Sequence, residues 1–234
     1  MLNADEIKIL WNSLETAAIS NASIRALKLV LVTAQRPGEV SGIHSSEIDG
    51  NWWTIPADRA KNGKVHRVYL TATAHEIISR ALEQVKLLRG IPSGEVYSGY
   101  IFPCPHLEKE KPMERHALSR ALARNFAWPL LYNGKPVFDD KGKPVTENRL
   151  GIEHFTPHDL RRTAATFMAQ SGEMDEVIDA VLNHAKQGVI KVYNQYRYDK
   201  EKQLALESWE RKLLSIITES QKKDNVVSIA RKAA

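Results

Sequence analysis

Five side chains of three chemical kinds follow one another along this chain in an order that could hold and attack a phosphodiester. They are Arg36, His158, Arg161, His184 and Tyr193. An arginine guanidinium matches two phosphate oxygens and stays charged at any working pH. A free tyrosine hydroxyl has a pKa of about 10 and is a weak nucleophile, but nearby cations lower that pKa. The set predicts attack by Tyr193 on a bound phosphodiester, with no metal ion and no cofactor.

The short spacings near the C-terminal end carry much of this prediction. If a helix begins near Asp159, His158 and Arg161 lie one turn apart on the same side. Taken singly, Arg161 and Arg162 could be surface ion-pair partners, and Arg36 alone indicates nothing specific. The combination favours chemistry, because the pentavalent transition state gains negative charge that fixed cations stabilise.

A proton donor for the leaving 5′-oxygen is the next requirement. Lys61 and Lys64 flank the sequence Asn62-Gly63, which is a strong tight-turn signal. Lysines in such places often only keep a hairpin tip soluble. Lys61 is the first candidate for the proton donor, and Lys64 is its rival.

Two other enzyme classes are excluded by spacing. His154 and His158 are four residues apart, but Pro157 between them breaks the helical face that a zinc pair would use. Cys104 is the single cysteine and lies among prolines with no paired base, which argues against a cysteine hydrolase. One cysteine also excludes an internal disulfide and fits a reducing cytosol.

Hydrophobic periodicity predicts the elements that must position these residues: a mostly α-helical (α+β) fold with a small antiparallel β-sheet. Strands are expected over Trp52–Pro56 and Val65–Leu70. Helices are expected from an N-cap at Asn3, then over Ser23–Ala34, Ala74–Arg89, Arg115–Trp128, Leu160–Gln170, Met174–Asn183 and Asp199–Glu219.

Several of the candidate residues fall at predicted helix ends. Pro37 disfavours helical geometry at Arg36, so Arg36 is expected at a helix end, where it can reach a ligand. His184 follows a helix whose dipole favours a protonated or hydrogen-bonding imidazole. The last helix has an apolar stripe that includes Leu206 and Trp209, and it could pack within its own chain or dock onto a neighbouring copy.

Polar surfaces suggest where a nucleic acid could lie. The chain has 234 residues and a net charge of +5, which permits such a partner without requiring one. Residues 129–157 form a long polar connection that can hold a small hairpin. The basic residues predicted to contact DNA are Lys64, Arg115, Arg120, Arg124 and Arg162. The sequence offers no apolar run long enough to cross a bilayer and no signal-peptide pattern at its start.

In these motifs the chain resembles the catalytic domain of the tyrosine recombinases, the phage-integrase family. The matching segments are Gln35-Arg36-Pro37-Gly38-Glu39, Lys61 before the Asn-Gly turn, His158-x-x-Arg161, Asn183-His184, and Tyr193 at the family's usual distance after that histidine. The resemblance spans roughly residues 1–210. The C-terminal segments look most like integrases of prophages and genomic islands.

The resemblance implies a role for each matching residue. Arg36, Arg161 and His184 would neutralise the scissile phosphate, and His158 would assist proton transfer. Lys61 would be the general acid, and Tyr193 would form a 3′-phosphotyrosine link that preserves the phosphodiester energy. Glu39 would support the arginines. The implied function is site-specific recombination, in which DNA is cleaved and rejoined to integrate or excise a mobile element.

Family membership also implies partners. They are double-stranded DNA attachment sites, further copies of this chain in a homotetramer on DNA, and accessory DNA-bending or excisionase proteins. Away from DNA the chain can be a monomer. No membrane partner is implied, and the expected location is the bacterial cytoplasm, at the nucleoid when DNA is bound.

This sequence departs from the family pattern in three ways. The family's usual glycine before the second histidine is Asn183 here, and Tyr196 and Tyr198 are rival nucleophiles. We expect residues 1–219 to form the catalytic domain and residues 220–234 a flexible basic tail. The N-terminal core-binding and arm-binding domains of such integrases are expected to be absent from this chain. A type IB topoisomerase and a non-catalytic DNA-binding module remain the alternative functions.

Overall fold

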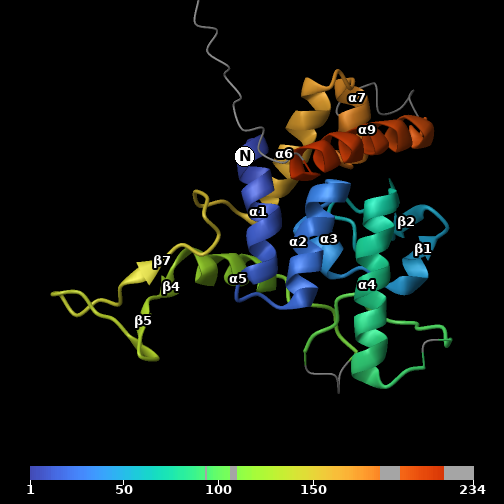
Figure 1. Ribbon diagram of the computed structural model, residues 1–234. Coiled ribbons are helices and arrows are strands. Elements are labelled where there is room, and N and C mark those ends of the chain that lie inside the picture. The colour runs from blue at the N-terminus through green and yellow to red at the C-terminus, as the bar shows by residue number, and fades with distance from the viewer. Residues whose placement is uncertain (93, 106–109, 185–195, 219–234) are drawn as a thin grey trace, which may run out of the picture.

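A computed structural model describes residues 1–92, 94–105, 110–184 and 196–218. The fold is mostly helical with small antiparallel sheets, as predicted (Figure 1). The helices are α1 (Ala4–Thr16), α2 (Asn21–Thr33), α3 (Pro37–Ser41), the 3-10 helix η1 (Ser45–Glu47), α4 (Ala72–Arg89), α5 (Ala117–Phe126), α6 (Pro157–Gln170), α7 (Asp175–Val181) and α9 (Asp199–Thr218). The candidate nucleophile Tyr193 and the predicted tail, residues 220–234, lie outside the described residues.

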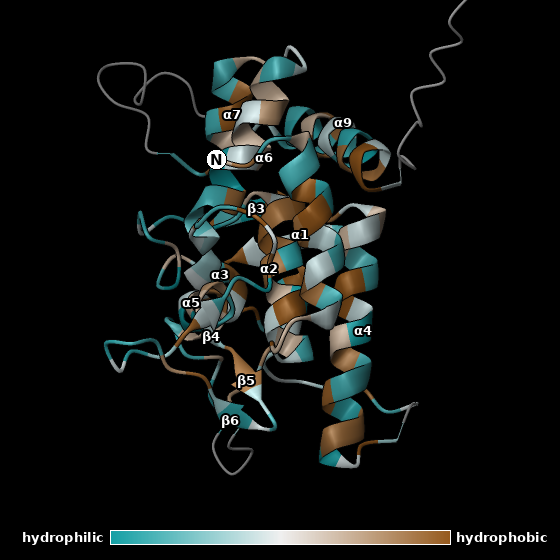
Figure 2. Ribbon diagram, turned by 60° about the vertical axis from the view of Figure 1, so that its left-hand side comes forward, coloured by the Kyte–Doolittle hydropathy of each residue, from teal (hydrophilic) through white to brown (hydrophobic). Residues whose placement is uncertain are grey.

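Helix α2 lies at the centre of the core and packs against α4, α6 and α9. Leu27, Leu29 and Val30 on this helix are at most 1% exposed, so it is apolar on nearly every side. In Figure 2 hydrophobic residues gather where α1 and α2 lie, while hydrophilic residues colour much of the outer surface. The helix that precedes Arg36 is thus held on several sides.

The chain's first helix begins where the sequence predicts. Asn3 accepts a hydrogen bond from the backbone N–H of Glu6, and the Glu6 side chain accepts from the backbone N–H of Asn3. This reciprocal pair is a capping box. The backbone N–H of Leu2 donates to Thr163 Oγ1 on α6 (2.9 Å), which ties the start of the chain to the helix that carries His158 and Arg161.

A three-stranded antiparallel sheet forms at one edge in the order β1 (Ile48–Asp49), β2 (Trp52–Ile55) and β3 (His66–Tyr69). Strands β2 and β3 are the predicted pair, with Trp53 opposite Val68. The Asn62-Gly63 turn does not join them directly, because it lies within the longer connection formed by residues 56–65. That connection places Lys61 beyond the sheet, next to α3.

Residues 128–147 form an arm that projects from the body (Figure 1). Strand β4 (Trp128–Pro129) pairs with β7 (Thr146–Glu147), and β5 (Leu131–Tyr132) pairs with β6 (Lys135–Pro136) beyond it. Two glycine turns at Gly134 and Gly142 have positive φ, as the predicted hairpin signals require. The arm exposes apolar side chains at Leu131, Tyr132 and Phe138.

Helix α9 packs into its own chain. Leu206, Trp209 and Leu213 are at most 1% exposed, and Trp209 Nε1 donates to the carbonyl of Leu31 on α2 (2.9 Å). Of the two arrangements left open by the sequence, the apolar stripe therefore adopts packing in cis. None of the described helices is both long and apolar enough to cross a membrane.

Candidate active site

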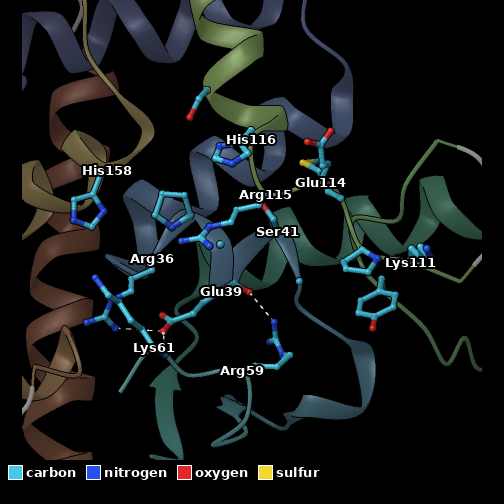
Figure 3. Close-up of a pocket in the computed structure, with 17 residues that line it drawn as sticks. Arg36, Glu39, Ser41, Arg59, Lys61, Lys111, Glu114, Arg115, His116 and His158 are labelled. Carbon is cyan, nitrogen blue, oxygen red and sulfur yellow. Dashed lines mark hydrogen bonds and ion pairs between the residues drawn. The ribbon is translucent and has the colours of Figure 1, made fainter. Parts of the chain in front are cut away.

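A surface pocket of about 840 Å³ opens between α3, the start of α5 and the start of α6. It brings together three of the six predicted catalytic residues, Arg36, Lys61 and His158. In Figure 3 these three lie on one side of the pocket and Lys111 lies on the opposite side. Residues far apart in sequence thus meet around one cationic space large enough for a phosphate group and its neighbours.

Arg36 occupies the N-cap position of α3 with extended backbone angles, φ −66° and ψ 137°. Pro37 at the first helical position sets this conformation, as the sequence predicts. Its Nη1 donates to Glu39 Oε1 (3.3 Å) and its Nη2 to the carbonyl of Asn183 (3.4 Å). Both hydrogen bonds are long, and a guanidinium has five N–H donors. Arg36 therefore keeps donors for a ligand in the pocket.

Arg161 is placed differently from Arg36. Its side chain is buried, with the residue 3% exposed, and it does not line the pocket. Nη1 donates to the carbonyl of Ala34 (2.9 Å), at the end of α2, and Nη2 donates to the carbonyl of Leu182, at the end of α7. Burial, and then the charge of Arg36, lowers the pKa of Arg161 to about 10, so it stays protonated at neutral pH. Arg161 supplies fixed positive charge and joins two helix ends.

His158 is the second residue of α6 and lines the pocket. The helix begins at Pro157, with Thr156 as its N-cap, and Asp159 Oδ2 accepts from both the N–H and the hydroxyl of Thr156. Partial burial, followed by the charges of Arg161 and Arg162, lowers the pKa of His158 although much of the ring is open to solvent. A neutral imidazole at this place can accept a proton at neutral pH.

His184 lies just beyond α7 and lines a second pocket, of about 420 Å³, together with Lys64 and Tyr196. Its Nδ1 lies 2.8 Å from Asp179 Oδ1, and its backbone N–H donates to the carbonyl of Asp179 (2.9 Å). Asn183 adopts the left-handed conformation, φ 50°, and so ends the helix in the role that glycine usually has. Asn62, which also lines the second pocket, follows Lys61 of the first pocket in the chain.

Side chains from other elements bind the last carbonyl groups of α7, which lack partners within the helix. The carbonyl of Val181 accepts from Gln35 Nε2 (3.0 Å) and is 3.1 Å from His66 Nε2. His66 Nε2 is also 3.2 Å from Gln35 Oε1. Both neighbours of Nε2 are carbonyl oxygens, which only accept hydrogen bonds, so this nitrogen carries the hydrogen. Sequence reasoning missed Gln35 and His66 in this role.

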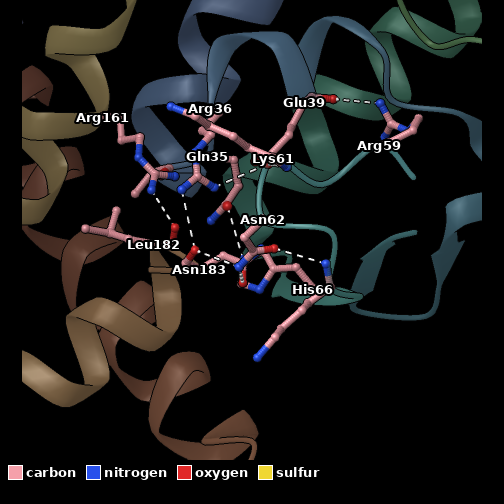
Figure 4. Close-up of polar contacts among 12 residues, drawn as sticks. Gln35, Arg36, Glu39, Arg59, Lys61, Asn62, His66, Arg161, Leu182 and Asn183 are labelled. Carbon is pink, nitrogen blue, oxygen red and sulfur yellow. Dashed lines mark hydrogen bonds and ion pairs between the residues drawn. The ribbon is translucent and has the colours of Figure 1, made fainter. Parts of the chain in front are cut away.

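The next two carbonyl groups are bound in the same way (Figure 4). Arg161 binds the carbonyl of Leu182. The carbonyl of Asn183 accepts from Arg36 Nη2 (3.4 Å) and Asn62 Nδ2 (3.2 Å). The two predicted arginines therefore fix the helix end from which His184 extends. Sequence reasoning gave Asn62 only a turn-forming role.

Replacing His66 with glutamine is expected to change how stability depends on pH. Burial, and then the charge of Lys202, lowers the pKa of His66 from 6.5 to about 3. The unfolded chain takes up a proton below pH 6.5 and the folded chain does not, so the wild type loses stability as pH falls from there toward 3. Between pH 7.5 and 5.5 we expect the wild type to lose about 1.4 kcal/mol more than His66→Gln. Urea unfolding at both pH values measures this, and identical pH dependences in the two proteins would disprove it.

Glu39 is buried, 4% exposed, between the residues of the first pocket. Its Oε1 accepts from Arg36 Nη1 (3.3 Å) and from the backbone N–H of Lys61 (3.3 Å). Arg59 donates to the Glu39 carbonyl (3.3 Å) and holds Glu47 through two hydrogen bonds. Glu39 therefore contacts both Arg36 and the loop of Lys61.

Of the basic residues predicted to contact DNA, Arg115 lines the first pocket. Arg120 and Arg162 are ion-paired, with Glu114 and Asp159 respectively. Three further basic residues that line the pocket were not predicted from the sequence: Arg59, Lys111 and His116. Arg59 and Lys111 lie in no recognisable sequence motif. His116 is the N-cap residue of α5, and that position alone does not indicate a site.

Arg115→Ala is expected to weaken binding to duplex DNA of any sequence. A guanidinium that contacts one phosphate contributes about one unit to the slope of log affinity against log salt concentration. We expect that slope to fall by about one unit in Arg115→Ala and to change little in Arg120→Ala, whose side chain is bound to Glu114. Fluorescence anisotropy across a salt series measures both slopes. Equal slopes in Arg115→Ala and the wild type would contradict the prediction.

The helical fold and the pocket of arginine, lysine and histidine side chains define a protein suited to phosphate groups. The Phage integrase family matches residues 1–127 and 143–200, so this chain belongs to that family. It is 27% identical over 211 residues to Prophage integrase IntA of Escherichia coli (strain K12), covering 89% of this chain but 43% of IntA. The chain thus spans less than half the length of this relative.

Solved structures share the fold. The integrase from mycobacterium phage Brujita aligns with a TM-score of 0.57 and 14% identity, over 94% of this chain and 64% of that one. XerH site-specific recombinase, bound to its difH substrate in a pre-cleavage complex, aligns with a TM-score of 0.53 and 18% identity, over 94% of this chain and 54% of that one. At these identities the likeness concerns the fold.

Proposed function

We propose that this chain cleaves and rejoins DNA as the catalytic part of a site-specific recombinase. The observation that carries the proposal is the pocket in which Arg36, Lys61 and His158 meet, with the helix end that bears His184 bound to Arg36 through Asn183. Family membership and the fold shared with XerH support DNA as the substrate. Attachment sites in bacterial DNA and a cytoplasmic location are part of this proposal.

The proposed chemistry gives these groups the roles that the family resemblance implies. The hydroxyl oxygen of Tyr193 forms a bond to phosphorus while the bond from phosphorus to the 5′-oxygen breaks. Lys61 gives a proton to the 5′-oxygen, and neutral His158 accepts the proton of the tyrosine. Arg36, Arg161 and His184 stabilise the charge that develops on the phosphate. The reverse reaction rejoins the strand without ATP, because the phosphotyrosine bond retains the energy.

Recombination between two duplexes requires four strand cleavages, and each copy of the chain supplies one nucleophile. We therefore propose that four copies act together on DNA. A single copy would contact DNA with one face and bind it weakly, with strong salt dependence.

The test uses a pool of DNA duplexes, nicked next to a randomised sequence so that cleavage releases a short strand and traps the covalent product. The expected result is a slowly migrating protein–DNA adduct on a denaturing gel, formed in EDTA. Sequencing the trapped DNA then gives the preferred site. No adduct from the whole pool would refute the proposal, and relaxation of plasmids of any sequence would favour a type IB topoisomerase instead.

A further inference from the structure

The side-chain amides of Asn62 and Asn183 connect the chain segments that line the two pockets. Asn62 Nδ2 donates to Asn183 Oδ1 (2.8 Å), and Asn183 Nδ2 donates back to Asn62 Oδ1 (3.2 Å). Asn62 Nδ2 is also 3.2 Å from the backbone carbonyl of Asn183. The two residues are 121 positions apart in sequence, so the pair is a long-range contact between the β2–β3 connection and the end of α7 (Figure 4).

Each asparagine lies next to a residue of the proposed chemistry. Asn62 follows Lys61, and Asn183 precedes His184. Asn62 Oδ1 also accepts from the backbone N–H of Lys64 (3.1 Å), which closes the turn around it. The backbone N–H of Lys61 donates to Glu39 Oε1 (3.3 Å) on the other side. The short connection that carries Lys61 is thus attached to the body on two sides.

Asn183 is also the position at which this chain departs from the family's usual glycine. A glycine would adopt the same left-handed backbone conformation without strain. It could not form the amide pair, because it has no side chain. Asparagine tolerates φ 50° and adds the side-chain contact. Glycine could also end the helix here, so ending the helix does not account for the side-chain amide of Asn183.

We propose that the Asn62–Asn183 pair is a positioning device, which holds Lys61 over the leaving 5′-oxygen while Arg36 and His184 hold the phosphate. This inference rests on the proposed function. A surface loop without such a contact samples many positions, and misplacing a proton donor by about 1 Å can cost about 100-fold in rate. Asn62 and Asn183 act through Lys61 and do not touch the reacting atoms.

The test compares Asn183→Gly with Asn133→Gly, which makes the same substitution at φ 49° in the arm turn, away from both pockets. Single-turnover cleavage is measured on a nicked duplex that carries the preferred site found by sequencing the trapped DNA, called the trapped-site duplex. It is also measured on the same duplex with sulfur in place of the bridging 5′-oxygen. A thiolate leaves without a proton, since the pKa of a thiol is about 8.5. We expect Asn183→Gly to cleave the oxygen substrate about 10- to 100-fold more slowly and the sulfur substrate at nearly the wild-type rate. Asn133→Gly should match the wild type on both.

Two further variants complete the design. Lys61→Ala should show the same rescue by sulfur as Asn183→Gly. Asn62→Ala combined with Asn183→Gly should be no slower than Asn62→Ala alone, because Asn62→Ala already removes every hydrogen bond between the two side chains. If Asn183→Gly loses the same fraction of its cleavage rate on both substrates, or loses none, the positioning role is overturned. Cleavage by the wild type would still support the proposed function in that case. Failure of the wild type to cleave either substrate would overturn both.

Discussion

Tyr193→Phe is expected to form no covalent adduct with DNA, a loss of about 10³-fold or more, because it removes the attacking oxygen. Tyr196→Phe and Tyr198→Phe are expected to form the adduct at close to the wild-type rate. The hydroxyl of Tyr196 donates to both carboxylate oxygens of Glu201, at 3.0 and 3.1 Å, and this hydrogen bond is the main cause of its raised pKa. A tyrosine with a raised pKa is a poorer source of the nucleophilic phenolate.

The measurement is adduct formation on the trapped-site duplex by the three variants side by side, with circular dichroism to show that each is folded. Digestion of the wild-type adduct and mass spectrometry then identify the tyrosine that carries the nucleotide. An adduct in Tyr193→Phe, or a nucleotide mapped to Tyr196 or Tyr198, would contradict the assignment.

Arg161→Ala is expected to abolish cleavage and to lower the free energy of unfolding by about 2–4 kcal/mol. The substitution leaves the carbonyl groups of Ala34 and Leu182 without the hydrogen bonds that they accept in a buried place. It also removes the link that Arg161 makes between the end of α2 and the end of α7, so Arg36 and His184 lose part of their support. Arg161→Lys keeps the charge but cannot reach both carbonyls with one planar fork.

Arg162→Ala is the matched control, since it removes the neighbouring, exposed guanidinium on the same helix. Its stability should stay within about 0.5 kcal/mol of the wild type. Urea unfolding of the three variants gives the free energies. A loss below about 1 kcal/mol in Arg161→Ala would show that its two buried hydrogen bonds contribute little.

Much of the fold could be predicted because its signals are local. The capping box at Asn3, the proline at position 157 and the apolar repeat of α9 each specify a helix within a few residues. The predicted helix to Asn183 ends at Val181, because Asn183 is left-handed. Strand β1 was missed, since a two-residue strand exists only through its pairing with β2.

The sequence indicated candidate site residues but not their arrangement. Family spacing indicated Arg36, Arg161 and His158, yet it could not show that Arg161 is buried while Arg36 faces a pocket. That difference depends on contacts between residues far apart in sequence, such as Arg161 with Ala34, which are 127 positions apart. The buried pairing of Gln35 with His66 was invisible for the same reason.

The arm has a consequence for how sequences of this family can differ. The family match stops at residue 127 and resumes at residue 143, so most of the arm is extra to it. Strands β4 and β7 pair at its base, and the Arg149 guanidinium stacks over Trp128 (4.2 Å), so the chain leaves and returns at one place. Doubling a loop closed in this way costs only about 0.6 kcal/mol. The length and sequence beyond this base can therefore change almost freely, and the same core can carry different surface features without any adjustment of the residues around Arg36.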